Sequence, residues 1–215
     1  MQRLRIRFCR EEALKFISHL DIMRLWQRAF SRAGIPLAYS EGFSPHPRMS
    51  LAAPLAVGVT SEAELMDIFC NQWSSPHSFT ATISQQLPTG IKLLQVYPIA
   101  PNQPSLQSQV RYAEYQVGIE TDKKQEKVES SIPSLLSAKN LPWQHQRDTG
   151  TRSYDLRALV NNLWLVEWRN HCCTIGMRLR CDSTGSGRPE QVTAALGFTR
   201  QPVSIHRTKL ILETS

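Results

Sequence analysis

The stretch GFSPHPRMS, residues 42–50, gathers the residue types that could contact an anionic ligand. His46 stands between two prolines, and Arg48 follows directly. Proline fixes its own φ and restricts the residue before it, so the sequence predicts a rigid loop. A histidine and an arginine held in a stiff loop favour ligand contact, and we expect Ser44, His46 and Arg48 to take part.

A histidine pair also suggests acid–base chemistry. His19 opens an expected helix and His46 lies in the loop, so each is at the end of an element. Histidine titrates near neutral pH, and two histidines can serve the two proton transfers of RNA cleavage without a metal. No spacing shows that the two rings meet. The alternative is local packing or capping for His19 and a loop-stiffening hydrogen bond for His46.

Arginines form two rows near the N-terminus. They alternate with apolar residues over 3–9, which predicts a strand with one buried and one basic face. Others recur at four-residue spacing along the expected helix 18–33. Two such rows could track a phosphate backbone, while the alternative is a solvated face with some arginines paired to acidic neighbours. The candidate phosphate contacts are Arg3, Arg5, Arg7, Arg24 and Arg28.

The second half offers three weaker candidates. Arg157 follows Asp155 closely, and a structural ion pair is the default interpretation. Arg188 ends a glycine-containing turn that opens a helix; such a turn can hold a phosphate, but a flexible turn explains it equally well. Arg207 lies in the last expected strand.

Composition narrows the class of protein. A formal net charge of +7 favours an anionic partner such as RNA. The 5 cysteines contain no C-x-x-C pair, so a disulfide framework or a zinc ribbon is not expected, and we expect no metal and no cofactor. No apolar stretch reaches the length of a membrane span and the N-terminus lacks a signal-peptide core, which predicts a cytoplasmic protein without a membrane partner.

The elements that must position these residues repeat in order. In each half the periodicity indicates strand, helix, strand, strand, helix, strand, the split pattern of a ferredoxin-like sandwich. The predicted fold is therefore α+β, with two tandem ferredoxin-like (βαββαβ) domains at 1–98 and 111–215. A stretch rich in Pro, Gln and Ser, residues 99–110, is expected to be a linker. The expected elements of the first half are 3–9, 18–33, 37–40, 64–69, 76–87 and 91–97. Those of the second half are 112–119, 124–137, 163–168, 172–181, 188–196 and 203–212.

The chain also resembles a known family over nearly its whole length, most specifically in the first half. The motifs FISHLD at 16–21, GIP at 34–36 and YSEGFSPHP at 39–47 are similar to those of a radical-SAM-linked bacterial family of unknown function, the DUF2344 type. APL at 53–55 extends the match, and DLR at 155–157 and GRP at 187–189 fit more loosely. Members of that family are encoded beside, or fused to, a cobalamin-binding radical SAM protein. They also lie near genes for a ribonuclease and ribosomal proteins.

The resemblance implies an accessory role, and three functions follow. The first is a non-catalytic RNA-binding module that presents RNA or a ribosome-related substrate to the radical SAM/cobalamin enzyme. The second is a metal-independent endoribonuclease that uses His19 and His46. The third is a protein-docking module that touches no nucleic acid, with tryptophans such as Trp73 as anchors.

Overall fold

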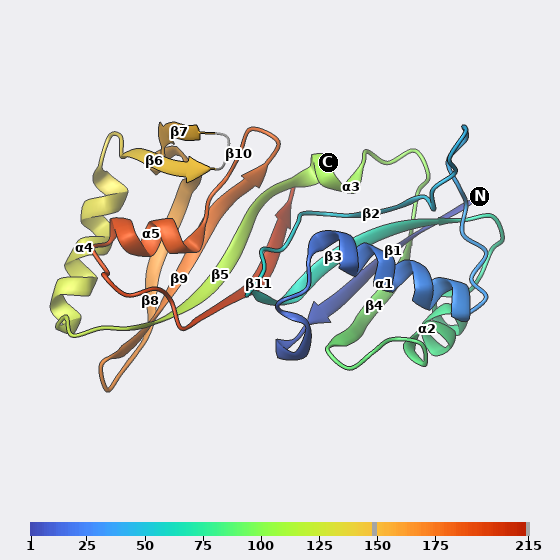
Figure 1. Cartoon of the computed structure of the whole chain (residues 1–215), viewed down its shortest axis with the longest axis horizontal. Helices are drawn as coiled ribbons and strands as arrows, with labels where there is room; N and C mark the ends of the chain where they lie inside the picture. Colours follow the sequence, from blue (N-terminus) through green and yellow to red (C-terminus); the bar gives the residue numbers. More distant parts are fainter. Residues whose placement is uncertain (148–149, 214–215) are drawn as a thin grey trace. The chain divides into compact units, whose positions relative to one another are not determined.

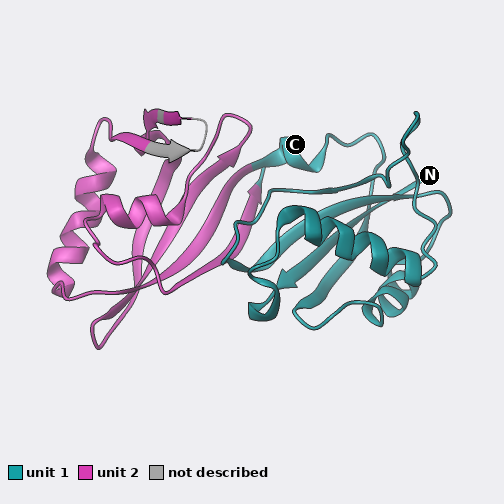
Figure 2. Cartoon of the chain, in the orientation of Figure 1, with its two compact units in different colours: residues 1–110, 212–215 teal, residues 111–211 magenta. Residues whose placement is uncertain are grey.

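The computed structural model describes residues 1–147 and 150–213, with the backbone alone at 145–147 and 152. It is a mixed α/β protein with two compact units (Figure 2). Unit 1 comprises Met1–Val110 and Leu212–Ser215, and unit 2 comprises Arg111–Ile211. No helix in the described ranges is long and apolar enough to span a bilayer.

The sheet of unit 1 is centred on β1 (Gln2–Arg10). β3 (Thr60–Cys70) pairs antiparallel with one edge of β1, and β4 (Ile91–Ile99) pairs antiparallel with the other. The short β2 (Met49–Leu51) adds antiparallel to the far edge of β3, which makes the order β4-β1-β3-β2. In the β1–β3 register Arg5 lies opposite Asp67, so the two side chains share a face of the sheet.

The first helix begins where the sequence predicts. α1 (His19–Arg32) has Ser18 as N-cap, whose hydroxyl accepts the backbone N–H of Asp21 at 3.2 Å. Gly34 follows the helix with φ of +63°, a conformation that glycine adopts without steric cost. The prediction of a strand at 37–40 is wrong. That segment makes only isolated bridges, and the paired strand forms at β2 instead.

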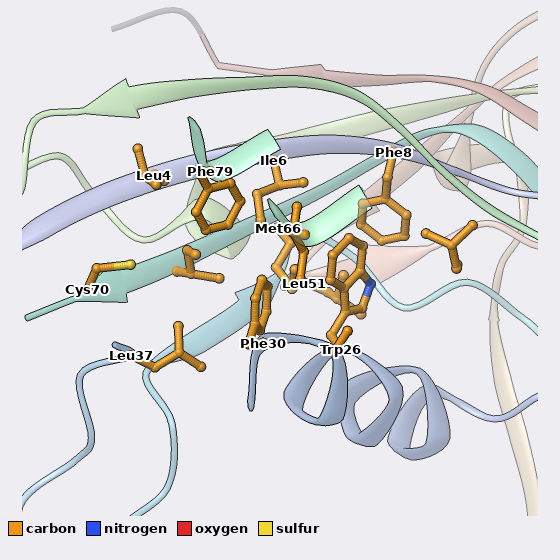
Figure 3. Close-up of a cluster of buried hydrophobic side chains, with 14 of the residues drawn as sticks. Leu4, Ile6, Phe8, Trp26, Phe30, Leu37, Leu51, Met66, Cys70 and Phe79 are labelled. Atoms are coloured by element: carbon orange, nitrogen blue, oxygen red, sulfur yellow. The ribbon is translucent and has the colours of Figure 1, made fainter. Parts of the chain in front are cut away.

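The core of unit 1 lies between the sheet and its helices, α1 and α2 (Pro76–Ser84) (Figure 3). Trp26 of α1 is fully buried and packs edge-on against Phe8 of β1, with ring centroids 4.9 Å apart. It also stacks on Phe30 at 5.4 Å. The alternation of β1 therefore points its apolar side chains at the helices, as the periodicity predicts.

The sheet of unit 2 is centred on β5 (Val110–Glu120), which pairs antiparallel with β9 (Cys172–Asp182) and lies beside β11 (Ser204–Leu212). β8 (Val160–Arg169) and β10 (Gly185–Ser186) pair antiparallel with β9. The helices of unit 2 are α4 (Gln125–Ser137) and α5 (Pro189–Ala195).

A separate hairpin, β6 (Pro142–Arg147) with β7 (Gly150–Asp155), was not expected from the sequence. Single 3-10 turns occur at Glu12–Leu14 and Arg157–Leu159.

The two units share one strand order when each is taken by itself (Figure 1). In unit 1 the first strand, β1, lies between β3 and β4; in unit 2 the first strand, β5, lies between β9 and β11. A helix follows the first strand and another precedes the last in both. The assignment as tandem ferredoxin-like domains, with the boundaries expected above, stays a prediction.

The segment expected as a linker has structure of its own. Its first residue, Ile99, still belongs to β4, and a short helix, α3 (Leu106–Gln109), occupies its end. Between them, the backbone carbonyls of Gln103 and Pro104 accept hydrogen bonds from Arg3. This stretch, residues 100–109, therefore packs on the sheet of unit 1 beside β1.

Candidate nucleic-acid interface

The loop between α1 and β2 is held at its base by hydrogen bonds. The backbone N–H of Arg48 donates to the carbonyl of Ala38 at 2.7 Å, and that of Ser40 donates to the carbonyl of His46 at 2.8 Å. The His46 N–H donates in turn to the Ser40 hydroxyl at 3.0 Å. These contacts add to the two prolines, so the loop, residues 39–48, presents its tip on a fixed base.

Large side chains stand exposed on this loop and beside it. Tyr39 is 54% exposed, and Phe43 at the loop tip is as exposed as in an extended chain. Trp73, just after β3, is 78% exposed. Ser44 and His46 are exposed as well. Aromatic side chains normally bury most of their area, so three exposed ones at one end of unit 1 indicate a contact surface.

Trp73 belongs to the same end of unit 1 as the loop. Gln2 at the start of β1 exchanges two hydrogen bonds of 2.9 Å with the backbone of Ser74. Met1, its neighbour, has its Sδ 3.3 Å from the Arg48 guanidinium. The loop and the N-terminus lie beside each other in Figure 1. We call Tyr39, Phe43, Arg48 and Trp73 the loop-end surface.

Arg48 is the cation of this surface. Its guanidinium lies over the ring of Phe69, 4.3 Å from the centroid, and is exposed to solvent. Over the described residues no carboxylate lies within ion-pair distance of it. A guanidinium that rests on an aromatic face keeps its charge available to an incoming anion.

The expectation of an open basic face on β1 is wrong for Arg3 and Arg5. Both are almost fully buried, at 3% and 5% exposure, and only Arg7 of that row is exposed. Both guanidinium groups bind the buried carboxylate of Asp67, at 2.6 Å from Arg3 and 2.7 Å from Arg5. In this arrangement neither can reach a phosphate.

The covering segment explains this outcome. Arg3 also donates to the Gln103 and Pro104 carbonyls at 2.6 and 2.8 Å, and Arg5 donates to the Gln109 side chain at 3.3 Å. Burial by itself would lower the pKa of Arg5, but the hydrogen bond and charge of Asp67 outweigh it and the pKa is raised. Arg5 is therefore a permanent buried cation with a fixed counter-ion.

The helix row remains on the surface. Arg24 and Arg28 are exposed on α1, and Arg24 pairs with Asp21 at 3.2 Å, as the solvated-face alternative anticipates. Such exposed pairs contribute little to stability. Their contact with phosphate stays a prediction.

His19 and His46 do not converge. His46 lies near the start of β1, because Arg48 contacts Met1. His19 lies near the end of β1, because Arg10 donates to the Ile17 carbonyl. The strand between these points is about 25 Å long at 3.3 Å per residue. A two-histidine cleavage mechanism therefore has no geometric support within unit 1.

Nδ1 of His19 is buried and lacks a hydrogen-bond partner among the described residues.

The candidates of the second half are dispersed. Arg157 donates to the Leu136 carbonyl at 2.7 Å and to the Val160 carbonyl at 2.6 Å, so it ties α4 to β8. The expected ion pair with Asp155 does not form; that carboxylate accepts the Arg157 backbone N–H instead. Arg188 is exposed just before α5, and Arg207 is completely buried.

No site for a metal stands out in the part of the chain that the structure describes: no three His, Cys, Asp or Glu side chains gather there. The cysteines are free. Burial, followed by the neighbouring Cys172, raises the pKa of the Cys173 thiol to about 11, which makes it a poor nucleophile at neutral pH.

A family comparison agrees with the motifs quoted above. The model of the family described as "Uncharacterized protein conserved in bacteria (DUF2344)" matches residues 3–189. The chain belongs to this family. The match includes the loop-end surface, so that surface is part of the DUF2344 region of the chain. No curated protein matches the sequence.

Solved structures similar to this chain include chains of two complexes that contain Cbf5 and Nop10. A chain in a crystal structure of a Cbf5-Nop10-Gar1 complex superposes with a TM-score of 0.51 and 9% identity, over 96% of this chain and 48% of that chain. A chain of an archaeal box H/ACA sRNP Nop10-Cbf5 complex gives a TM-score of 0.48 and 10% identity, over 97% of this chain and 48% of that one. The DUF2344 chain thus spans about half the length of these relatives, and at such identity the likeness concerns the fold alone.

Proposed function

We propose that the protein is a non-catalytic RNA-binding module whose loop-end surface holds single-stranded RNA. The observation that carries the proposal is a set of exposed aromatic side chains beside an arginine that has no carboxylate partner among the described residues, at the end of unit 1 where the loop has its hydrogen-bonded base. Sequence-tolerant binding of single strands combines such aromatic platforms with cations that follow the backbone.

The chemistry of each part fits a single strand better than a duplex. Phe43 and Trp73 offer open aromatic faces on which unstacked bases can lie. Arg48 can bind a phosphate oxygen or stack on a base. Paired bases in a duplex present no free face, so a surface built on stacking discriminates against them.

The proposed partner is a radical SAM/cobalamin-binding protein, to which this chain would present RNA or a ribosome-related substrate. The support is the family membership together with the motifs that resemble the radical-SAM-linked proteins. Each unit is proposed to be a ferredoxin-like domain, on the strand orders β4-β1-β3-β2 and β11-β5-β9-β8. The fold likeness to RNA–protein complex components fits an RNA-related role.

The test is fluorescence anisotropy with a labelled 12-nucleotide RNA and its duplex, at about 50 and 200 mM salt. We expect tighter binding of the single strand and a fall in affinity with salt, because each neutralised phosphate releases counter-ions. The Arg48→Ala variant should reduce the salt slope by about 1. Arg169→Ala, which removes an exposed arginine of unit 2 that pairs with Glu167, serves as control. Equal loss in both variants, or no binding at low salt, would refute the proposal.

A second candidate, docking of a protein, is favoured by an apolar patch at the opposite end of unit 1. Phe16, Leu20 and Val57 are 72%, 64% and 58% exposed. Gly58 next to Val57 donates its N–H to the Lys15 carbonyl at 2.7 Å, which brings the segments together. Co-purification of the radical SAM protein after nuclease treatment, lost in Phe16→Ala and kept in Phe43→Ala, would establish docking at this patch. Co-purification that survives both changes would contradict it.

A further inference from the structure

Unit 2 contains an open cavity of about 500 Å³ that the proposed RNA surface does not use. It is lined by the segment that joins β5 to α4, by the first turn of α4 and by the segment that follows α5: residues 120–124, 127 and 197–200. The volume is within the range of about 300–1,000 Å³ found for small-molecule sites. All lining residues belong to unit 2.

Cations dominate the lining. Four cationic side chains face two carboxylates: Lys123, Lys124, Lys127 and Arg200 against Glu120 and Asp122. Arg200 engages both carboxylates, at 3.6 and 3.2 Å. Arg200 offsets one of the two carboxylate charges and the three lysines outweigh the other, so the lining keeps a net positive charge. No ion-pair partner of Lys124 or Lys127 occurs among the residues that the structure describes.

Lys123 is held in place before any ligand arrives. Its ammonium donates to the Leu196 carbonyl at 2.9 Å and lies 4.8 Å from the centre of the Phe198 ring. Gly197 allows this approach, since a Cβ there would lie 2.9 Å from the ammonium nitrogen. Burial, and next the charge of Lys127, lowers the pKa of Lys123, so the two like charges repel each other when the cavity is empty.

From this geometry we infer that the cavity of unit 2 binds a phosphorylated small molecule of nucleotide size. Three lysines in the lining of one cavity favour a multiply charged anion, because lysine binds phosphate as a compact point charge. An anion between Lys123 and Lys127 would relieve their repulsion. The cavity is wider than a lone phosphate needs, so a phosphate carrying a further group fills it better.

The first measurement is isothermal titration calorimetry with adenosine 5′-monophosphate, inorganic phosphate and, as the uncharged control, adenosine. We expect saturable binding of both phosphates and none of adenosine. A Lys124→Gln/Lys127→Gln variant should lose about tenfold or more in affinity, since two charges leave the cavity. Lys139→Gln is the matched control, because Lys139 is exposed beyond the other end of α4.

Two results would overturn the inference: no binding of either phosphate at millimolar concentration, or equal affinity in the double variant and the wild type. Tighter binding of inorganic phosphate than of the nucleotide would show that the ligand is phosphate alone and would overturn the nucleotide-sized assignment. Arg48→Ala should leave binding unchanged, because it lies in unit 1. A failure of the phosphate-binding test would therefore leave the proposed RNA surface in place. A failure of the RNA-binding test would likewise leave the cavity proposal in place.

Discussion

Arginines occur on β1 and on the loop of residues 39–48, and their surroundings give them opposite roles. Arg3 and Arg5 are buried around Asp67 beneath residues 100–109. Arg48 is exposed, rests on Phe69 and has no carboxylate partner among the described residues. A guanidinium with a buried counter-ion holds the fold together, and one without a counter-ion can bind an external anion. The partner, more than the residue type, decides the role.

The largest effect should come from the buried arginine cluster. Asp67→Asn removes the shared counter-ion and leaves two buried guanidinium groups without compensation, so we expect a loss of about 3–5 kcal/mol in the free energy of unfolding. Urea denaturation followed by circular dichroism measures it. Asp21→Asn, which breaks an exposed pair with Arg24, should cost less than about 1 kcal/mol. A similar loss in the free energy of unfolding for both variants would contradict the distinction between buried and exposed arginines.

The Phe43→Ala variant tests RNA binding by the loop-end surface. Loss of a stacking face should weaken binding of single-stranded RNA by about 1–3 kcal/mol and leave the unfolding midpoint in place. Phe16→Ala removes an exposed aromatic side chain at the opposite end of unit 1 and should leave RNA affinity unchanged. Fluorescence anisotropy measures the RNA affinity of both variants. An equal loss of affinity in the two would show that RNA binding is not specific to the loop-end surface.

A largely buried carboxylate with a partly exposed partner, Asp182 with Arg180, should contribute an intermediate amount to stability. Asp182 accepts from Arg180 and from the Thr184 hydroxyl and N–H, at 2.8, 2.6 and 2.8 Å. Burial opposes this, but the hydrogen bonds lower the pKa of Asp182 from 3.8 to about 2. The lowered pKa stabilises the folded state above pH 4, and this contribution is lost as the pH falls from about 4 to about 2. Because Arg180 is 41% exposed, we expect about 1–2 kcal/mol. Urea midpoints measured across this pH range should fall less in Asp182→Asn; parallel curves would contradict the assignment.

The smallest effect is expected for the ion pair that occupies the equivalent strands of unit 2. Glu114 on β5 and Arg178 on β9 pair at 2.6 Å, with Arg178 39% exposed. Glu114→Gln should cost about 0–1 kcal/mol, since solvent screens the pair. A cost near that of Asp67→Asn, measured by the same urea denaturation, would show that exposure is not what separates the two units.

Local patterns determined the elements and several of their ends. The alternation of β1 and the Ser18 cap of α1 are encoded by neighbouring residues, and the structure has both. The strand expected at 37–40 failed because its pairing depends on β3, which lies some thirty residues away in the sequence. The β6–β7 hairpin was missed because its polar residues carry little apolar signal.

The sequence by itself determined that β1 has one apolar and one basic face, that the prolines around His46 stiffen its loop, and that the chain carries a cationic surplus. Only the tertiary structure decided that residues 100–109 cover the basic face, that His19 and His46 lie at opposite ends of unit 1, and that distant lysines and Arg200 line one cavity. The physical reason is the distance along the sequence over which each interaction acts. Periodicity and capping act between residues a few positions apart, whereas burial and ion pairing depend on contacts across the fold.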